Sequence, residues 1–336
     1  PRVGPVNAQG VPTYALDGAD ANSFTTDFLT DRTIDFIRRH AAAPFCWHVS
    51  FPDPHGPNTV RAPYDTMFFN LDFKQPRSAQ SPGKNLPAYA ATLAGAFNKN
   101  QMALYFGMVK CLDDNVGRLL DALDALKLSE NTIIVFFSDN GGVHWVAGTD
   151  ASAATFGITG IPITSNAPLR GGKATTYEGG TREPCVVVWP GVAKPGAVTD
   201  SIIQSTDFFP TFVEMLKLSL PAAHTFDGKS FAPALRGAAH DRGPTFCHFP
   251  HTTPASGGLA STWVRVGDWK LVRYETKFAN NEIVEQPLQR TAQPQFQLFD
   301  LAKDPGEKTD VFAKNPEVGE KLKARLAAIV AATRSR

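Results

Sequence analysis

The sequence predicts an α/β fold, in which a mostly parallel central sheet with covering helices is followed by a small antiparallel sheet with a helix. In the first part of the chain, amphipathic helical stretches alternate with short apolar runs, as in strand-helix-strand units. Beyond about residue 221 the pattern changes to short strand candidates separated by turn residues. We therefore expect two domains, 1–225 and 226–336.

Two amphipathic helices lead into two short strands of the first domain. Residues 25–40 carry apolar side chains among charges at helical spacing, and they precede the apolar run 44–51, which ends near His55. Residues 101–126 repeat apolar side chains at the same spacing and precede the run 132–137. That run is short, β-branched and unalternating, which is typical of a parallel strand covered on both faces.

The second domain is predicted to be a small antiparallel sheet with a helix packed on it. Gly267-Asp268 has the composition of a tight hairpin turn between two of its strands. The terminal stretch 316–333 is amphipathic and should pack on the sheet. Four short segments are strand candidates: 245–249, 262–266, 269–274 and 295–301.

Polar residues follow the strand candidate 132–137 directly, in the segment Ser138-Asp139-Asn140-Gly141-Gly142. Ligands of open α/β sheets bind beyond the carboxyl ends of the strands, which is where Asp139 and Asn140 would lie. Carboxylate and amide oxygens suit calcium or magnesium better than zinc. The alternative is a turn without a metal, because Asp, Asn and Gly gather in turns for backbone reasons alone.

Two further segments carry groups that suit an anionic ligand. Pro54-His55-Gly56-Pro57 would present an imidazole on a rigid turn. The glycine-rich segment 168–184 contains Lys173 and leads into the apolar run 185–189. Glycines let the backbone approach a ligand, while the lysine supplies a point charge.

These segments, in this order, resemble the sulfatase family of the alkaline-phosphatase-like superfamily. The resemblance implies an alkaline-phosphatase-like fold and the hydrolysis of sulfuric esters, and it covers nearly the whole chain. The segments that carry it are Pro54-His55-Gly56-Pro57, Ser138-Asp139-Asn140-Gly141, Leu169-Arg170-Gly171-Gly172-Lys173, Glu178-Gly179-Gly180-Thr181-Arg182, and further stretches at 206–211, 227–230, 267–271 and 297–307.

The resemblance implies roles for individual residues. Asp139 and Asn140 would ligate Ca²⁺, with Mg²⁺ as the other possibility, and Lys173 and His55 would contact the sulfate or the bridging oxygen. Because a histidine can protonate a departing alkoxide, His55 is the candidate general acid. The family's nucleophile is a formylglycine, which attacks sulfur in its hydrated form.

The substrate is expected to be a sulfated sugar or polysaccharide. Residues 58–87 are rich in proline, glycine, asparagine and serine, which predicts a long surface excursion beside the cleft. That loop, together with His248 and His251, could line a cleft in which the protein forms hydrogen bonds with sugar hydroxyls. His144 follows the turn that bears Asp139 and Asn140, and its side chain either faces the substrate or is merely solvated.

The sequence lacks the family's nucleophile segment. Sulfatases oxidise a Cys or Ser to formylglycine in a Cys/Ser-x-Pro/Ala-x-Arg segment near the N-terminus, and no such segment occurs here. The family's paired N-terminal aspartates and its lysine-histidine segment are absent as well. We therefore expect the chain to be the C-terminal part of a sulfatase, inactive alone and dependent on the N-terminal portion of the same enzyme.

Composition excludes some classes of partner. With 33 Lys+Arg against 32 Asp+Glu, the formal net charge of +1 creates no global field that would favour nucleic acid. The longest apolar runs are strand-sized and interrupted by charge, so no membrane span is expected. The resemblance implies a periplasmic or secreted location. The four cysteines lack metal-type spacing, which indicates buried thiols, with one disulfide as the alternative.

Two other functions compete with a sulfatase. One is a phosphodiesterase or phosphonate hydrolase of the same superfamily, and the other is a non-catalytic homologue that binds sulfated glycans. The upstream sequence would decide among them, because a threonine nucleophile with a two-zinc ligand set would favour the phosphodiesterases. The single Asp-Asn pair within this chain favours a single-metal sulfatase.

Overall fold

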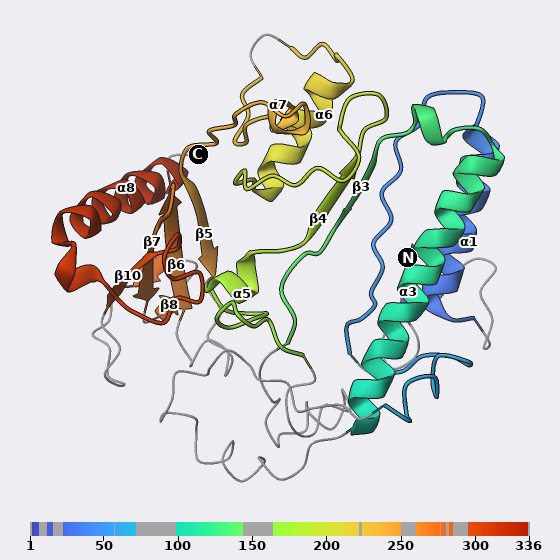
Figure 1. The fold of residues 1–336 in the computed structure, drawn as a ribbon, viewed down its shortest axis with the longest axis horizontal. Coiled ribbons are helices and arrows are strands. Elements are labelled where there is room, and N and C mark those ends of the chain that lie inside the picture. Colours follow the sequence, from blue (N-terminus) through green and yellow to red (C-terminus); the bar gives the residue numbers. More distant parts are fainter. Residues whose placement is uncertain are drawn as a thin grey trace. The chain divides into compact units, whose positions relative to one another are not determined.

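A computed structural model describes residues 2–6, 12–15, 23–56, 58–71, 99–143, 164–221, 224–249, 260–275, 277–279, 282–284 and 295–334. The chain forms two compact units (Figure 1). The described residues up to 131 belong to the first unit and those from 132 onward to the second. The predicted domain boundary at residue 225 falls inside the second unit. The division of the chain into the domains 1–225 and 226–336 remains a prediction.

Two packed helices form the centre of the first unit. They are α1 (Thr25–His40) and α3 (Lys99–Ala125), as the helical spacing predicted. Ile34 and Ile37 of α1 are buried, as is Met108 of α3. The unit also contains the antiparallel strands β1 (Arg2–Val6) and β2 (Pro12–Ala15) and the short 3₁₀ helix η2 (Ser129–Asn131).

The expectation of a strand at 44–51 is wrong. These residues form no regular secondary structure and are largely exposed, including Trp47, whose ring stacks on Phe36 of α1 at a centroid distance of 4.1 Å. A strand needs a hydrogen-bonded neighbour, and none pairs with this segment within the described ranges. His48, within the same segment, is exposed as well.

The second unit begins with a two-stranded ribbon that departs from the predicted geometry. Strand β3 (Ile134–Phe137) pairs with β4 (Cys185–Val188) in antiparallel register, from Ile134↔Val188 to Phe137↔Cys185. We expected a parallel strand covered on both faces, whereas Phe136 and Phe137 are each 43% exposed. All strand pairs between described residues are antiparallel, so the parallel part of the predicted sheet has no counterpart among them.

Short helices follow the ribbon. They are α5 (Glu178–Thr181), η3 (Ser205–Asp207), α6 (Phe208–Met215) and α7 (Ala232–Leu235). The fully buried carboxylate of Asp207 holds several of these segments together, because it accepts hydrogen bonds from the backbone of Gln204 (2.8 Å) and Lys229 (2.8 Å) and from Arg242 Nε (2.9 Å). The segment around Asp207 is therefore structural.

The predicted C-terminal sheet and helix are confirmed. Four antiparallel strands lie in the order β10-β7-β6-β5, and the hairpin between β6 and β7 turns at Gly267, whose φ is +58°. The elements of this part are β5 (Thr245–Phe249), β6 (Ala260–Val266), β7 (Trp269–Glu275), β8 (Lys277–Ala279), β9 (Glu282–Val284), β10 (Phe296–Asp300), η5 (Phe312–Lys314) and α8 (Pro316–Arg334). Strands β8 and β9 pair with each other in a separate ribbon.

Each face of the four-stranded sheet has its own core, because successive strand residues point to opposite sides. On one face, Val264, Leu271 and Leu298 pack against Leu322 and Leu326 of α8, and Figure 1 shows the helix beside the strands. Burying each of these leucines stabilises the fold by roughly 1.5–3 kcal/mol.

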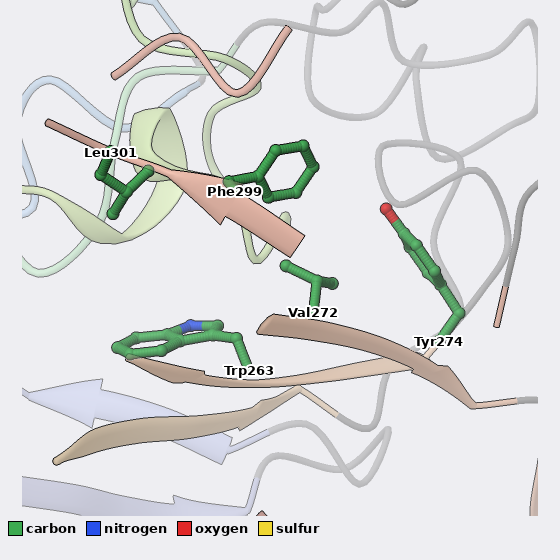
Figure 2. Packing of buried hydrophobic residues seen from close by; sticks show 5 residues of the cluster. All are labelled: Trp263, Val272, Tyr274, Phe299 and Leu301. Atoms are coloured by element: carbon green, nitrogen blue, oxygen red, sulfur yellow. The ribbon is translucent and has the colours of Figure 1, made fainter. Parts of the chain in front are cut away.

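The opposite face of the sheet packs toward the glycine-rich segment. Trp263, Val272, Tyr274, Phe299 and Leu301 gather there, and Figure 2 shows these five side chains on their strands. Tyr177, the residue before α5, packs against this cluster. This face of the sheet thereby supports the segment that bears Lys173.

The cysteines are all free, and their surroundings differ from the expectation. Cys111 is buried and Cys247 half-buried, whereas Cys46 and Cys185 are exposed, so the prediction of buried thiols holds for Cys111 alone. None of the helices in the described part of the chain is long and apolar enough to cross a bilayer.

Candidate active site

The turn that follows β3 carries the two predicted metal ligands. Its first residue is held by a backbone hydrogen bond from Ser138 to the Pro184 carbonyl (3.2 Å), which continues the β3–β4 ladder. Asp139 is exposed and Asn140 half-buried. The Asn140 amide nitrogen donates to the Gly141 carbonyl (3.1 Å), so the amide is oriented by its own turn. The side-chain oxygen of Asn140, the atom that could bind a cation, is not the one used in this bond.

Two glycines let this turn lie against its neighbours. A Cβ on Gly141 would stand 1.8 Å from the Gly179 carbonyl oxygen, and one on Gly142 would stand 2.7 Å from Thr164 Oγ1. Both distances are shorter than any side chain tolerates, so glycine is required at both positions. The turn with Asp139 and Asn140 consequently packs directly on the backbone of α5.

The structure brings Lys173 next to this turn. The backbone N–H of Lys173 donates to the Gly142 carbonyl (3.1 Å), and the lysine side chain is half-buried. Of the residues predicted from the sequence, Asp139, Asn140 and Lys173 are therefore neighbours. Asp139 and Asn140 would supply only two of the roughly six to eight oxygens that calcium takes. Within the residues that the structure describes, no group of three or more His, Cys, Asp or Glu side chains is arranged to hold a metal.

A second carboxyl group lies beside Asp139. The last register pair of the ribbon is Phe137↔Cys185. Beyond this pair, the chain that follows β3 leads to Asp139, and the chain that precedes β4 contains Glu183. Burial, together with the charge of Asp139, raises the pKa of Glu183 to about 7. The Oε1 atom of Glu183 is buried and has no hydrogen-bond partner among the described residues. Two carboxyl groups thus lie close together at this end of the ribbon, and their repulsion favours the protonated form of Glu183.

A buried ion-pair network lies beneath the glycine-rich segment. The Lys270 ammonium on β7 is completely buried, 2.9 Å from Glu178 Oε1 and 3.0 Å from Glu307 Oε1. Arg265 Nη1 lies 3.3 Å from Glu178 Oε2, and the backbone N–H of Glu178 donates to Glu307 Oε2 (2.6 Å). The first turn of α5 is therefore attached to both the sheet and the 302–307 loop.

Burial and charge act in opposite directions on these carboxyls. Burial would raise the pKa of Glu178, but the charges of Lys270, Arg265 and Arg182 together outweigh it and lower that pKa. Burial raises the pKa of Glu307, which Lys270 offsets only in part. This network was not predicted from the sequence. The polar Lys270 between apolar strand residues Trp269 and Leu271 was the available signal.

The predicted histidines are placed only in part. His55 lies in the first unit, exposed, with Nδ1 2.7 Å from the Gly56 carbonyl oxygen. His248 on β5 is half-buried, with Nδ1 2.6 Å from Thr262 Oγ1, and by strand alternation it shares a sheet face with Phe246, opposite to Cys247 and the Tyr177 side. His144 and His251 lie outside the described residues. The roles of these four histidines remain predictions.

Known structures share the fold of the chain. A Ps i-CgsB structure in complex with k-i-k-neocarrahexaose matches 93% of this chain and 56% of its own, with a TM-score of 0.65 and 23% identity. A structure of BT4656 with its substrate D-glucosamine-2-N,6-O-disulfate matches 93% of this chain and 70% of its own (TM-score 0.64, 21% identity). The phosphonate monoester hydrolase from Silicibacter pomeroyi matches 99% and 64% (TM-score 0.62, 24% identity). The alkaline-phosphatase-like α/β class predicted from the sequence is confirmed.

Sequence similarity identifies the family. A sulfatase of Formosa agariphila is 29% identical over 307 residues, which is 87% of this chain and 46% of that protein. The N-acetylgalactosamine-6-sulfatase of Mus musculus is 31% identical over 252 residues, 71% of this chain and 46% of that enzyme. The chain thus spans about half the length of these relatives. Residues 8–218 match the sulfatase family, and residues 172–332 match the C-terminal region of N-sulphoglucosamine sulphohydrolase. The chain belongs to the sulfatase family.

Proposed function

We propose that the protein to which this chain belongs hydrolyses sulfate monoesters with the help of a calcium ion. The observation that carries the proposal is the 3.1 Å hydrogen bond from the Lys173 N–H to the Gly142 carbonyl. It joins the loop that bears a cationic side chain to the turn that bears Asp139 and Asn140. Membership of the sulfatase family supports the same chemistry.

The residues at the turn fit a hard cation. Asp139 and Asn140 offer a carboxylate and an amide oxygen, which calcium prefers, and magnesium would accept the same donors. The Glu183 carboxyl beside them, whose buried Oε1 has no hydrogen-bond partner among the described residues, would ionise more readily next to a bound cation. A cation bound by Asp139 and Asn140 would offset the repulsion between the Asp139 and Glu183 carboxylates.

Each protein group would have a defined task in the reaction. The sulfuryl oxygens carry negative charge while the alcohol departs, and a calcium ion would help to neutralise that charge. Lys173 would hold a non-bridging or bridging oxygen with a preorganised positive charge. We assign His55 the protonation of the departing alkoxide. The nucleophile of this family is a formylglycine, and we assign no residue of this chain to that role.

The substrate is proposed to be a sulfated carbohydrate. One relative is named N-acetylgalactosamine-6-sulfatase, and one protein of the same fold was solved with D-glucosamine-2-N,6-O-disulfate as its substrate. We assign His144, His248 and His251 to substrate contacts outside the sulfate pocket. A site built to hydrogen-bond a hydroxyl rejects analogues that lack it, so positional specificity would reside in such contacts.

The test is calcium-dependent sulfate release by the full-length protein. We expect turnover of 4-nitrocatechol sulfate that a calcium chelator removes and that Asp139→Ala reduces together with calcium affinity. Asp268→Ala, an exposed aspartate on the β6–β7 hairpin, is the matched control and should keep both. Sulfate release that resists both the chelator and Asp139→Ala would refute the calcium assignment.

A second candidate function is phosphonate monoester hydrolysis, because a hydrolase of that name shares the fold over 99% of this chain. Comparing kcat/KM for an aryl sulfate and an aryl phosphonate in the same preparation separates the two. A sulfatase should prefer the sulfate by a wide margin. Binding of a sulfated glycan without turnover of either ester would instead favour the non-catalytic alternative.

A further inference from the structure

Two irregular loops carry the candidate groups of the site, and neither belongs to a helix or strand. The metal turn, residues 138–142, bears Asp139 and Asn140, and the glycine-rich loop, residues 168–173, bears Lys173. Catalysis by fixed charges requires a constant separation between such groups. Something in the structure must therefore hold one loop against the other.

The side chain of Asn166 lies between the two loops and bonds to both. Its Oδ1 accepts the Gly142 N–H (2.9 Å), while its Nδ2 donates to the Gly142 carbonyl (2.9 Å) and to the Gly171 carbonyl (3.0 Å). Asn166 thus engages both backbone groups of Gly142 in the way that a neighbouring strand would. One amide carries two donors and one acceptor, so all three of these bonds are within its capacity.

The environment of Asn166 leaves little freedom to the metal turn. The Thr164 hydroxyl donates to the Val143 carbonyl (2.5 Å), and the Gly142 carbonyl also accepts the Lys173 N–H (3.1 Å). Because the missing side chain of Gly142 lets Thr164 approach, the turn is contacted from the Thr164 and the Asn166 side at once. Asn166 is half-buried, so its bonds are partly shielded from competing water.

We propose that Asn166 is a positioning residue of the active site, an inference that rests on the sulfatase function proposed above. Its three hydrogen bonds are all to backbone groups of the two loops. It fixes the distance between the ligand-bearing turn and Lys173 by locking Gly142 to Gly171. A displacement of about 1 Å between groups of an active site can lower the rate about a hundredfold, so loss of this amide should lower kcat.

Two substitutions and a matched control test the role. Asn166→Ala removes all three bonds, whereas Asn166→Asp keeps the acceptor for the Gly142 N–H and sets a carboxylate oxygen against two carbonyls. Asn315→Ala is the control, because Asn315 likewise donates from Nδ2 to a backbone carbonyl, that of Val311 (3.1 Å), at the start of α8. Its bond belongs to neither of the two loops.

The measurements are kcat and KM on an aryl sulfate and amide hydrogen exchange in the calcium-free, full-length protein. We expect both Asn166 variants to lose about tenfold or more in kcat with a smaller change in KM, and to exchange the Gly142 and Lys173 amides faster. Asn315→Ala should keep the wild-type kcat and the wild-type exchange at both amides, whatever it loses in melting temperature. That contrast separates positioning from general stability.

Two results would overturn the inference. Exchange at Gly142 and Lys173 that is unchanged in Asn166→Ala would show that the amide does not hold the loops. Faster exchange with an unchanged kcat would show that holding them does not matter to the reaction. If the wild-type protein releases no sulfate, the proposed function fails first, and the exchange data still report separately on whether Asn166 joins the loops.

Discussion

Replacing Lys270 by methionine should destabilise the protein by about 3–5 kcal/mol, which is the usual cost of removing one partner from a buried ion pair. The Lys270 ammonium is fully buried between Glu178 (2.9 Å) and Glu307 (3.0 Å). Methionine keeps most of the side-chain volume but not the charge. The two carboxylates would then face each other, with Arg265, 3.3 Å from Glu178, as the remaining cation of the network.

The size of this loss in stability follows from the two carboxylates that lose their lysine partner. Glu307 is fully buried and Glu178 nearly so, at 3% exposure, so neither carboxylate can regain its hydration without opening the fold. The expected cost is a large share of the roughly 5–15 kcal/mol that stabilises a typical domain. Replacing Glu307 by glutamine in the Lys270→Met variant removes one of the two uncompensated charges, so it should recover part of the lost stability.

The deficit should also depend on pH, and its sign can be worked out. Lys270 lowers the pKa of Glu178 and offsets the burial that raises the pKa of Glu307. Removal of Lys270 should raise the folded-state pKa of both carboxyls, and that of Glu307, which burial already raises, should move further above its unfolded value. Such groups destabilise the fold once they ionise, as pH rises through the raised pKa, so the deficit should be larger at about pH 8 than at about pH 5.

Urea unfolding at both pH values, followed by tryptophan fluorescence, measures the deficit. Lys303→Met is the control, because Lys303 pairs with Asp300 (2.6 Å) while 83% exposed, and it should change the stability little at either pH. A deficit for Lys270→Met that is no larger than that of the control, or one that grows as the pH falls, would refute the reasoning.

Three further predictions concern single side chains. Lys173→Ala should lower kcat on an aryl sulfate by about a hundredfold or more, since a preorganised charge is lost, and a wild-type rate would make Lys173 a surface lysine. Asp207→Asn should reduce the free energy of unfolding by about 3 kcal/mol, because an amide nitrogen would meet the N–H groups that now donate to this buried carboxylate; denaturant titration checks it. His248→Ala should lower kcat/KM on a sulfated sugar more than on a small aryl sulfate if His248 contacts the substrate. Equal losses would instead indicate a structural role through its contact with Thr262.

Local patterns in the sequence were sufficient to predict the three long helices, α1, α3 and α8, and the C-terminal sheet. Helix α1 begins and ends where the periodicity of 25–40 placed it, and α8 packs through Leu322 and Leu326 as its amphipathic spacing predicted. The Gly267 turn was predictable because a tight hairpin favours a residue that tolerates positive φ. These features depend on neighbours along the chain, so the sequence contains the information directly.

The strands of the first domain were harder to predict, because a strand is defined by its partner. The run 44–51 has strand-like composition but no neighbour within the described residues, and it forms no strand. The run at β3 does form one, but it pairs antiparallel with β4, about fifty residues away, a partner that an apolar stretch cannot specify.

The candidate site shows the same division. Asp139, Asn140 and Lys173 could be named from the sequence because their motifs are contiguous and sit beside strand ends and glycines. Only the tertiary structure revealed that Lys270, 92 residues from Glu178, neutralises that carboxylate, and that Asn166 bonds to Gly142. Such contacts arise when distant segments pack and buried polar groups must find partners. A local pattern can single out a polar residue within an apolar strand, as at Lys270, but it cannot identify the partner.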